Sequence, residues 1–460
     1  MTARKYFGTD GIRARVGDLL MTPDFVMRLG LAAGSVLVSQ AALSSTSKTL
    51  PKVIIGRDTR LSGKMLESAL EAGFSAAGVD VYLLGEMPTP GVAYLTRTFH
   101  ASLGVVISAS HNLFEDNGIK FFGFDGRKLS DALELLIERA VDESIPMVGP
   151  ESIGRVYPVK DASGRYIEFC KSSVPPFFSL AGVKLVIDSA HGAGYQIAPA
   201  VFRELGAEVI EIGCQPDGLN INLKTGATDT QALQARVLAE KADLGLALDG
   251  DGDRVILVDH LGRRIDGDEI LYVLALEAKR KGLLGAGGVV GTLMSNLALE
   301  RALQASQIPF ARTQVGDRYV MQALHERSWY LGGESSGHII WLSSTTTGDG
   351  IIAGLQVLCV MRDLHSSLSE LLQGYQKCPQ VMINLSHTYP SQKLDRKFLV
   401  YFEKLQQEAS DLLGVRGRVL IRPSGTEPVI RVMVEAESES LAQQHAREIA
   451  WKVNVFLEEK

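Results

Sequence analysis

Three aspartates share one short loop of the sequence. Asp249, Asp251 and Asp253 alternate with glycines in the run LGLALDGDGDRVILVD. Carboxylates this close repel one another, so the loop is costly to order without a cation. A calcium EF-hand does not fit. Arg254 and His260 occupy the positions where an EF-hand loop needs Gly and a bidentate Glu, and strand-like runs flank this loop where an EF-hand has helices. Hard oxygen ligands in an open loop, with room for a phosphate oxygen, favour Mg²⁺.

Ser110 follows a second apolar run, GVVIS, and has His111 beside it. Lys120 lies in the next apolar run, after an expected turn at Asn117-Gly118. We therefore expect a buried strand to end at an exposed loop that carries Ser110. The following strand should place Lys120 close to the same loop. Taken alone, this stretch is also typical of a hairpin whose hydroxyls satisfy turn backbone.

Three further loops carry polar side chains. In YLGGESSGHII, the exposed Glu334 and Ser336 suit the hydroxyls of a sugar and His338 suits acid–base chemistry, although a Gly/Ser turn with a surface histidine is the alternative. The opening FGTDGIR offers Arg13 as an anion contact. A loop near the C-terminus combines hydroxyls, backbone amides and arginines as a phosphate clamp does, with an ordinary turn as the alternative. Its residues are Arg422, Ser424, Gly425, Thr426 and Arg431.

Strands and helices must position these loops. A strand, a loop of small residues and a helix recur three times, at intervals of about a hundred residues, which predicts three related α/β layers with loops on one rim. The units open with KVIIG, KLVIDSAHGAG and GVVGTLMSN, and their helices are expected at residues 64–77, 195–205 and 297–304. A dinucleotide fold is not favoured, because no G-x-G-x-x-G follows these strands.

Residues 361–395 lose this pattern and contain Pro379 and Pro390, which predicts a domain junction and hinge region. The tail beyond it is typical of a small α+β domain in which a polar loop joins two strands. The expected elements are a helix at 395–413, strands at 419–422 and 429–436, and a helix at 438–457.

Composition excludes several classes of protein. The chain has 460 residues, enough for about three or four domains. Its net charge of −6, with both signs interspersed, argues against nucleic acid or an anionic membrane as a main partner. Four scattered cysteines without a C-x-x-C pair predict neither a disulfide framework nor a zinc site. The start has no apolar signal core and no uncharged apolar run reaches membrane-spanning length, so a cytoplasmic location is expected.

Together, four of these loops resemble, in the right order, the active-site loops of the α-D-phosphohexomutase superfamily. Members of that superfamily carry S-A-S-H-N-P, D-G-D-G-D-R, G-E-x-S-G-H and R-x-S-G-T-E-P. The resemblance implies an α/β fold of three related α/β/α mixed-sheet domains and a smaller C-terminal α+β domain, with the active site in the central cleft. The corresponding domains are residues 1–162, 163–265, 266–378 and 379–460.

The resemblance also implies roles for the residues. Ser110 would be the phosphoserine and, with the three aspartates, a ligand of one Mg²⁺ per active site. Lys120 is the preferred general acid/base, and Arg13, His111 and His338 would assist. Glu334 and Ser336 would hold sugar hydroxyls. The phosphate that is not reacting would be held by Arg422, Ser424, Gly425, Thr426 and Arg431.

The opening FGTDGIR, and GCQPDGLNIN followed by GATD, resemble the branch of the superfamily that acts on amino sugars. That branch implies glucosamine 6-phosphate and glucosamine 1-phosphate as substrates, glucose or glucosamine 1,6-bisphosphate as activator, and a product that feeds UDP-N-acetylglucosamine and peptidoglycan precursors. Ser335 stands where the branch usually has Gln, which leaves the phosphomannomutase/phosphoglucomutase branch as the alternative. A homodimer is a family expectation. A silent sugar-phosphate-binding protein and a Mg²⁺-dependent phosphatase are rivals of other classes.

Overall fold

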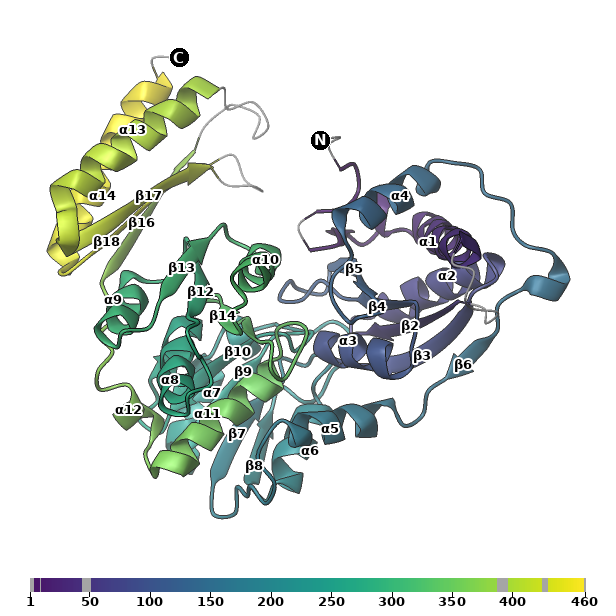
Figure 1. The fold of residues 1–460 in the computed structure, drawn as a ribbon, viewed down its shortest axis with the longest axis horizontal. Helices are drawn as coiled ribbons and strands as arrows, with labels where there is room; N and C mark the ends of the chain where they lie inside the picture. Colours follow the sequence, from purple (N-terminus) through teal and green to yellow (C-terminus); the bar gives the residue numbers. More distant parts are fainter. Residues whose placement is uncertain (1–3, 9, 44–50, 387–395, 424–428, 459–460) are drawn as a thin grey trace. The chain divides into compact units, whose positions relative to one another are not determined.

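The computed structural model describes residues 4–8, 10–43, 51–386, 396–423 and 429–458. The chain divides into two compact units, residues 1–292 with 311–372 and residues 293–310 with 373–460. The first unit contains three β-sheets, which we call the first, second and third layers in chain order (Figure 1). Within the described residues, no helix has both the length and the hydropathy needed to cross a bilayer.

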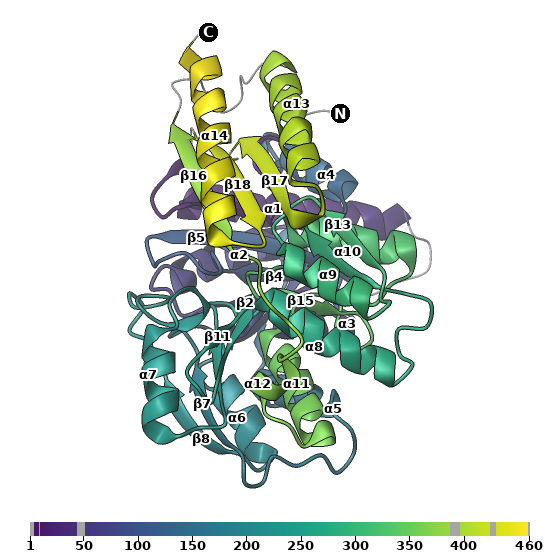
Figure 2. The same cartoon turned by 90° about the vertical axis from the view of Figure 1, so that its left-hand side faces the viewer.

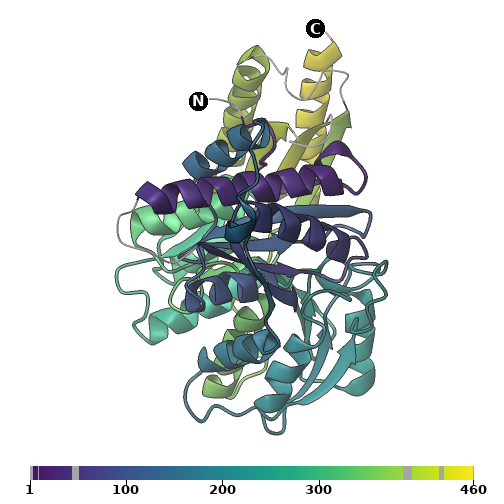
Figure 3. The same ribbon diagram turned by 90° about the vertical axis from the view of Figure 1, so that its right-hand side faces the viewer.

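The first layer is a six-stranded sheet in the order β1-β5-β4-β2-β3-β6. Strands β2, β3, β4 and β6 are parallel, and β5 pairs antiparallel with β4 and β1. The long helices α1 and α2 lie side by side beside the sheet, as Figure 3 shows. The elements are β1 (Ile12–Arg15), α1 (Pro23–Leu43), β2 (Lys52–Arg57), α2 (Gly63–Ala76), β3 (Asp80–Glu86), α3 (Thr89–Thr98), β4 (Leu103–Ile107), β5 (Asp116–Gly123), α4 (Asp131–Val141) and β6 (Val156–Pro158).

The second layer is a five-stranded sheet in the order β11-β10-β9-β7-β8. Strands β7, β8 and β9 are parallel, whereas β9 and β10 form an antiparallel hairpin around the aspartate loop. The elements are α5 (Ala162–Ser172), β7 (Lys184–Asp188), α6 (Ile197–Glu204), β8 (Glu208–Ile212), α7 (Gln231–Glu240), β9 (Leu244–Leu248), β10 (Val255–Asp259) and β11 (Arg264–Ile265).

The third layer is a four-stranded sheet in the order β13-β12-β14-β15. Strands β12 and β14 are parallel, and β14 and β15 form an antiparallel hairpin around Glu334. The elements are α8 (Gly267–Arg280), β12 (Val289–Thr292), β13 (Phe310–Thr313), α10 (Asp317–Arg327), β14 (Leu331–Gly333), β15 (Ile339–Trp341), α11 (Gly350–Leu364) and α12 (Leu368–Leu371).

The three layers share one plan, which confirms the predicted fold class. Each has parallel strands followed by an antiparallel hairpin, β4–β5, β9–β10 or β14–β15, and the second layer adds β11 antiparallel to β10. The loop of each hairpin carries polar residues singled out from the sequence. One local prediction was wrong: Asn117 and Gly118 lie within β5, not in a turn, because β5 begins at Asp116 and both residues pair with β1.

The second unit is a three-stranded antiparallel sheet in the order β16-β18-β17, with α13 and α14 packed on one face (Figures 1 and 2). Buried Phe398, Phe402 and Val432 contribute to its core. Residues 361–395, where the strand–loop–helix pattern is lost, contain the end of α11, which continues through Leu364, as well as α12 and strand β16. The elements are α9 (Leu297–Ala305), β16 (Gln380–Ser386), α13 (Arg396–Leu413), β17 (Gly417–Pro423), β18 (Val429–Ala436) and α14 (Glu439–Glu458).

Candidate active site

Ser110 stands three residues beyond the end of β4 and points at the second layer. Its hydroxyl donates a hydrogen bond of 2.7 Å to Oδ2 of Asp249. The prediction of an exposed loop was wrong, because Ser110 is only 1% exposed. Its backbone has a φ of 53°, the left-handed region that non-glycine residues rarely adopt. Strain of this kind persists only where the surroundings over-determine the conformation.

Arg60 holds the backbone of Ser110 in this conformation. Its side chain is fully buried, and its guanidinium donates to the carbonyl oxygens of Ser110 at 3.1 Å and Asn112 at 2.8 Å. It also donates to the carbonyls of Leu113 and, at 3.2 Å, Asp116. One side chain therefore holds four carbonyls of the loop that carries Ser110.

Two further groups fix the same loop. Buried Asp58 accepts a 2.8 Å hydrogen bond from Nε of Arg60 and a 2.5 Å bond from the hydroxyl of Ser108. That hydroxyl in turn accepts the backbone N–H of Ser110 at 2.9 Å. From the second layer, the amide of Asn222 donates to the carbonyl of Ser110 at 2.9 Å. Asp58, Arg60 and Asn222 were not predicted from the sequence, although the R-D-T-R run at the end of β2 was a usable signal.

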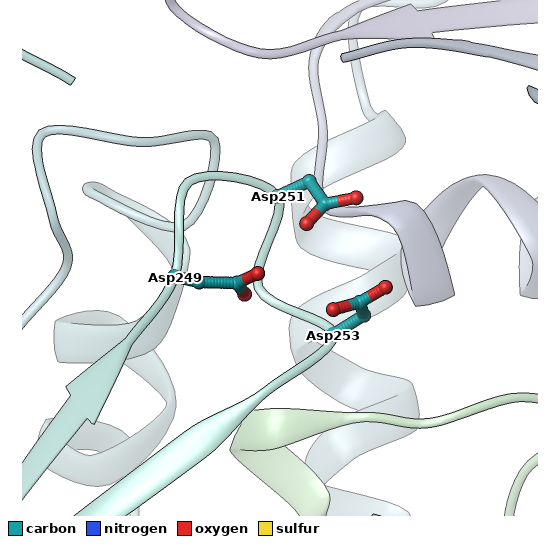
Figure 4. Close-up of side chains that lie close together, drawn as sticks. All are labelled: Asp249, Asp251 and Asp253. Carbon is teal, nitrogen blue, oxygen red and sulfur yellow. The ribbon is translucent and has the colours of Figure 1, made fainter. Parts of the chain in front are cut away.

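The aspartate loop forms a buried carboxylate cluster. Figure 4 shows Asp249, Asp251 and Asp253 projecting from one loop toward the same space, and one ligand atom from each lies within 4.8 Å of the others. All three are buried, which corrects the expectation of an open loop. Among the described residues, Oδ1 of Asp251 and Oδ1 of Asp253 have no hydrogen-bond partner. Burial, together with repulsion from Asp253 and Asp251, raises the pKa of Asp249 well above its usual range.

These features fit a divalent cation. Two unpartnered, buried carboxylate oxygens are costly to leave unsatisfied, and oxygen atoms are the ligands that Mg²⁺ prefers. The hydroxyl of Ser110 lies in hydrogen-bond contact with the same cluster through Asp249. The donor set is therefore that of a hard-cation site.

Lys120 projects from β5 into the cluster. Its ammonium lies 2.8 Å from Asp251, 3.2 Å from Asp10 and 3.6 Å from Asp253. Burial opposes the charge, but the attraction of Asp10 and the other carboxylates outweighs it and raises the pKa of Lys120. Lys120 and Ser110 therefore both contact the aspartate cluster, as the sequence predicted, but the site is buried rather than exposed.

His338 reaches the cluster from β14–β15. Its Nδ1 lies 3.6 Å from Asp253 and its Nε2 lies 3.6 Å from Asp317 at the start of α10. Burial disfavours its charged form, but Asp253 and then Asp317 outweigh this effect and raise the pKa of His338 to about 9. The ring packs against Gly348, where a Cβ atom would stand 2.4 Å from Nε2, so any side chain there would displace the imidazole.

The other predicted residues of the first unit lie around this cluster. Glu334 is buried rather than exposed, and its carboxylate accepts the backbone N–H of Gly316 at 3.0 Å. Ser336, in the same loop, is partly exposed. Nδ1 of His111 lies 3.1 Å from the guanidinium of Arg254, and burial, then Arg254, lowers the pKa of His111 to about 4, which leaves it neutral at pH 7. Arg13 forms an ion pair with Asp10.

The predicted phosphate clamp lies in the second unit. Arg422 of β17 pairs directly with Arg431 of β18. Burial and then the neighbouring Arg431 lower the pKa of Arg422, because two guanidinium groups repel. Ser424, Gly425 and Thr426 lie outside the described residues.

Comparison with known proteins identifies the family that has this fold and this site. Four family models match in succession, described as α/β/α domains I, II and III and the C-terminal domain of phosphoglucomutase/phosphomannomutase. They match residues 4–146, 165–262, 266–378 and 383–452. Phosphoglucosamine mutases of Escherichia coli O157:H7 and Escherichia coli O127:H6 are each 56% identical over 451 residues, covering 98% of this chain and 99% of the relative.

Solved structures agree on the fold. A phosphoglucomutase/phosphomannomutase family protein from Burkholderia thailandensis has a TM-score of 0.80 and 25% identity, with 99% of this chain and 98% of that chain covered. An N-acetylphosphoglucosamine mutase from Aspergillus fumigatus, solved with GlcNAc-6P and magnesium, has a TM-score of 0.69 and 17% identity, with 99% and 96% covered.

Fold and site together define a phosphohexomutase, an isomerase that transfers a phosphoryl group within its substrate. The chain belongs to the phosphoglucomutase/phosphomannomutase family, and its full-length identity to curated relatives supports the phosphoglucosamine mutase branch. The superfamily predicted from the sequence is confirmed.

Proposed function

We propose that this enzyme interconverts glucosamine 6-phosphate and glucosamine 1-phosphate through a phosphorylated Ser110. One observation carries the proposal: the Ser110 hydroxyl is held 2.7 Å from a buried aspartate cluster by a dedicated set of hydrogen bonds. The choice of amino sugar is supported by relatives named phosphoglucosamine mutase at 56% identity. In the cell, the product would feed UDP-N-acetylglucosamine and peptidoglycan precursors, in the cytoplasm.

In the forward direction, the bond between phosphorus and Oγ of Ser110 breaks as a bond forms from phosphorus to the sugar O1. The proton of the sugar hydroxyl leaves and Ser110 regains one, which yields glucosamine 1,6-bisphosphate. After this intermediate turns by about half a rotation, Oγ of Ser110 loses its proton and attacks the phosphorus on O6. The bond from phosphorus to O6 breaks, O6 takes up a proton, and glucosamine 1-phosphate leaves the restored phosphoserine. The free bisphosphate, or glucose 1,6-bisphosphate, would phosphorylate an idle enzyme and so act as activator.

Asp249, Asp251, Asp253 and Ser110 would hold one Mg²⁺, which when bound offsets the negative charge of the phosphoryl group. Lys120 is the preferred general acid/base. Carboxylates keep its ammonium protonated, which is the form that a general acid needs, and Lys120 would give this proton up in one half-reaction and take it back in the other. His338 and Arg13 add positive charge, and His111 would assist in its neutral form beside Arg254.

The substrate would be held at both ends. Glu334 and Ser336 would bind sugar hydroxyls. We assign the four domains to residues 1–162, 163–265, 266–378 and 379–460, with the last binding the phosphate that is not reacting. The phosphate ligands in that domain would be Arg422, Ser424, Gly425, Thr426 and Arg431.

The experiment that tests this proposal compares turnover of glucosamine 1-phosphate and glucose 1-phosphate, with Mg²⁺ and a catalytic trace of hexose 1,6-bisphosphate. A large preference for the amino sugar supports the proposal. Equal or reversed preference would move the enzyme to the hexose branch, and turnover of neither would refute the mutase assignment. Mass spectrometry of the resting enzyme locates the phosphate, which must fall on Ser110.

A further inference from the structure

Around Lys120 and His338, the charged groups form a closed ring of alternating sign. Each positive group in the ring lies between two carboxylates, and each carboxylate between two positive groups. The ring draws on all three layers, and five of its six members are not proposed ligands of the cation. In order around the ring, the members are Lys120, Asp10, Lys128, Asp317, His338 and Asp253.

Lys128 is the member that joins the two halves of this ring. Its ammonium lies 2.5 Å from Asp317 and also contacts Asp10. Asp10 lies 3.2 Å from Lys120, and Asp317 lies 3.6 Å from Nε2 of His338. Lys128 is thus linked through a single carboxylate to Lys120 and through another to His338. These are the two groups proposed to move or offset charge in the reaction.

The backbone and the surroundings fix Lys128 in place. Its residue forms an isolated antiparallel bridge with Phe122 of β5, two positions beyond Lys120. Its side chain is 19% exposed. Burial disfavours its charge, but Asp317 and Asp10 outweigh that effect and raise the pKa of Lys128, so it is a cation at neutral pH.

We propose that Lys128 is a positioning residue, which through Asp10 and Asp317 holds Lys120 and His338 in their working geometry across the first and third layers. Without its charge, Asp317 keeps only His338 as an ionic partner within the ring, and Asp10 keeps Lys120. Each carboxylate is then free to draw its partner toward itself and away from Asp251 and Asp253. The inference rests on the mutase function proposed above.

A purely structural ion pair between layers would look similar, and the molecule offers a matched control. Arg318, the next residue after Asp317, joins α10 to α4 by ion pairs of 2.6 Å to Asp131 and 2.7 Å to Glu134. It therefore links the same two layers as Lys128 does. In the described residues, none of its ion pairs is to a member of the ring.

The test compares full-length Lys128→Met, Lys128→Arg and Arg318→Met in steady-state mutase assays. Lys128→Met should lower kcat by roughly 10²-fold with KM changed by less than about threefold, since small displacements of reacting groups have effects of that order. Lys128→Arg should recover at least about tenfold of the loss, and Arg318→Met should keep kcat within about threefold. Equal effects of the two Met variants, or a change confined to KM, would overturn the proposal.

A second readout does not depend on the sugar. In protein labelled with ¹⁵N-histidine, the ring signals of His338 at a fixed pH should move in Lys128→Met and stay in place in Arg318→Met. Unmoved signals in Lys128→Met would overturn the proposal even if the enzyme turned over neither sugar phosphate, which separates its failure from that of the proposed function. Should Lys128→Met not fold, Asp317→Asn breaks the ring from the other side and must give a kcat loss of the same order.

Discussion

Arg60 offers the most direct test of how the proposed nucleophile is held. Replacing it with methionine removes the donors to four loop carbonyls while keeping a long apolar side chain. It also leaves Asp58, which is fully buried, without its cation. The substitution therefore acts on the conformation of Ser110 and on the stability of the first layer by two separable routes.

The size of each effect can be worked out. Removing one partner of a buried ion pair costs about 3–5 kcal/mol. Alternatively, Asp58 could become protonated once its cation is gone. The ordinary pKa of a carboxyl lies about three units below pH 7, so protonating it there costs a similar free energy, about 4 kcal/mol. At roughly 2–4 °C per kcal/mol for a domain of this size, the melting temperature should fall by roughly 6–20 °C. Loss of the carbonyl contacts should lower kcat by roughly 10²-fold, as a displacement of about 1 Å does.

The assay pairs thermal unfolding with mutase turnover in Arg60→Met and in the double variant Asp58→Asn/Arg60→Met. The double variant removes the uncompensated charge, so it should be more stable than Arg60→Met by several degrees. Its kcat should stay low, because the carbonyls of the Ser110 loop still lack their donor. Near-normal kcat in Arg60→Met, or recovery of kcat and stability together, would refute the reasoning that Arg60 positions Ser110.

Further predictions concern the proposed phosphoserine, the cation and a buried carboxyl at the start of α11. Ser110→Ala should lower turnover by at least about 10³-fold in a coupled assay, because it removes the covalent step, and near-full activity would contradict the assignment. Mg²⁺ should lower the pKa of His338 from about 9 in an NMR titration, because a cation at the cluster offsets Asp253; an unchanged pKa would argue against the cation site. Burial raises the pKa of Asp349 to about 6, although it accepts hydrogen bonds from Ile352 and Tyr166. The folded state then binds more protons than the unfolded state between about pH 4 and 6, so thermal stability should fall by up to about 3 kcal/mol as pH rises through this window, and Asp349→Asn should lack that slope.

The sequence indicated which residues form the candidate site, but not that their side chains are buried. Ser110, Lys120 and the aspartates stand next to apolar runs, which made their loops visible from pattern alone. Small polar residues between strands are typical of exposed turns, yet here loops from different layers cover one another. Gly250, for example, lies so close to the Ser110 loop that a Cβ atom there would stand 2.6 Å from the carbonyl oxygen of Ser110. Contacts of this kind join distant segments, and no local pattern encodes them.

The positioning residues were missed for the same reason. Arg60 and Asn222 reach Ser110 across 50 and 112 residues of sequence. Strand β16 is a different case: Val381, Ile383 and Leu385 share one face, but Met382 interrupts the alternation with polar residues, and two prolines nearby outweighed that short signal. Strict apolar–polar alternation over about 4–8 residues predicts a half-buried strand, and this stretch lacks it.

The hydrogen bonds of the two serines favour Ser110 over Ser108 as the proposed phosphoserine. Both hydroxyls are buried and lie two residues apart. The Ser108 hydroxyl donates to Asp58 and accepts from the backbone of Ser110, so both of its hydrogen-bonding functions serve the loop itself. The Ser110 hydroxyl instead donates to Asp249, a member of the cluster suited to bind a cation. A phosphoryl group on Ser108 would break the contacts that hold the loop, whereas one on Ser110 would replace a single hydrogen bond with charge that the cation site can offset.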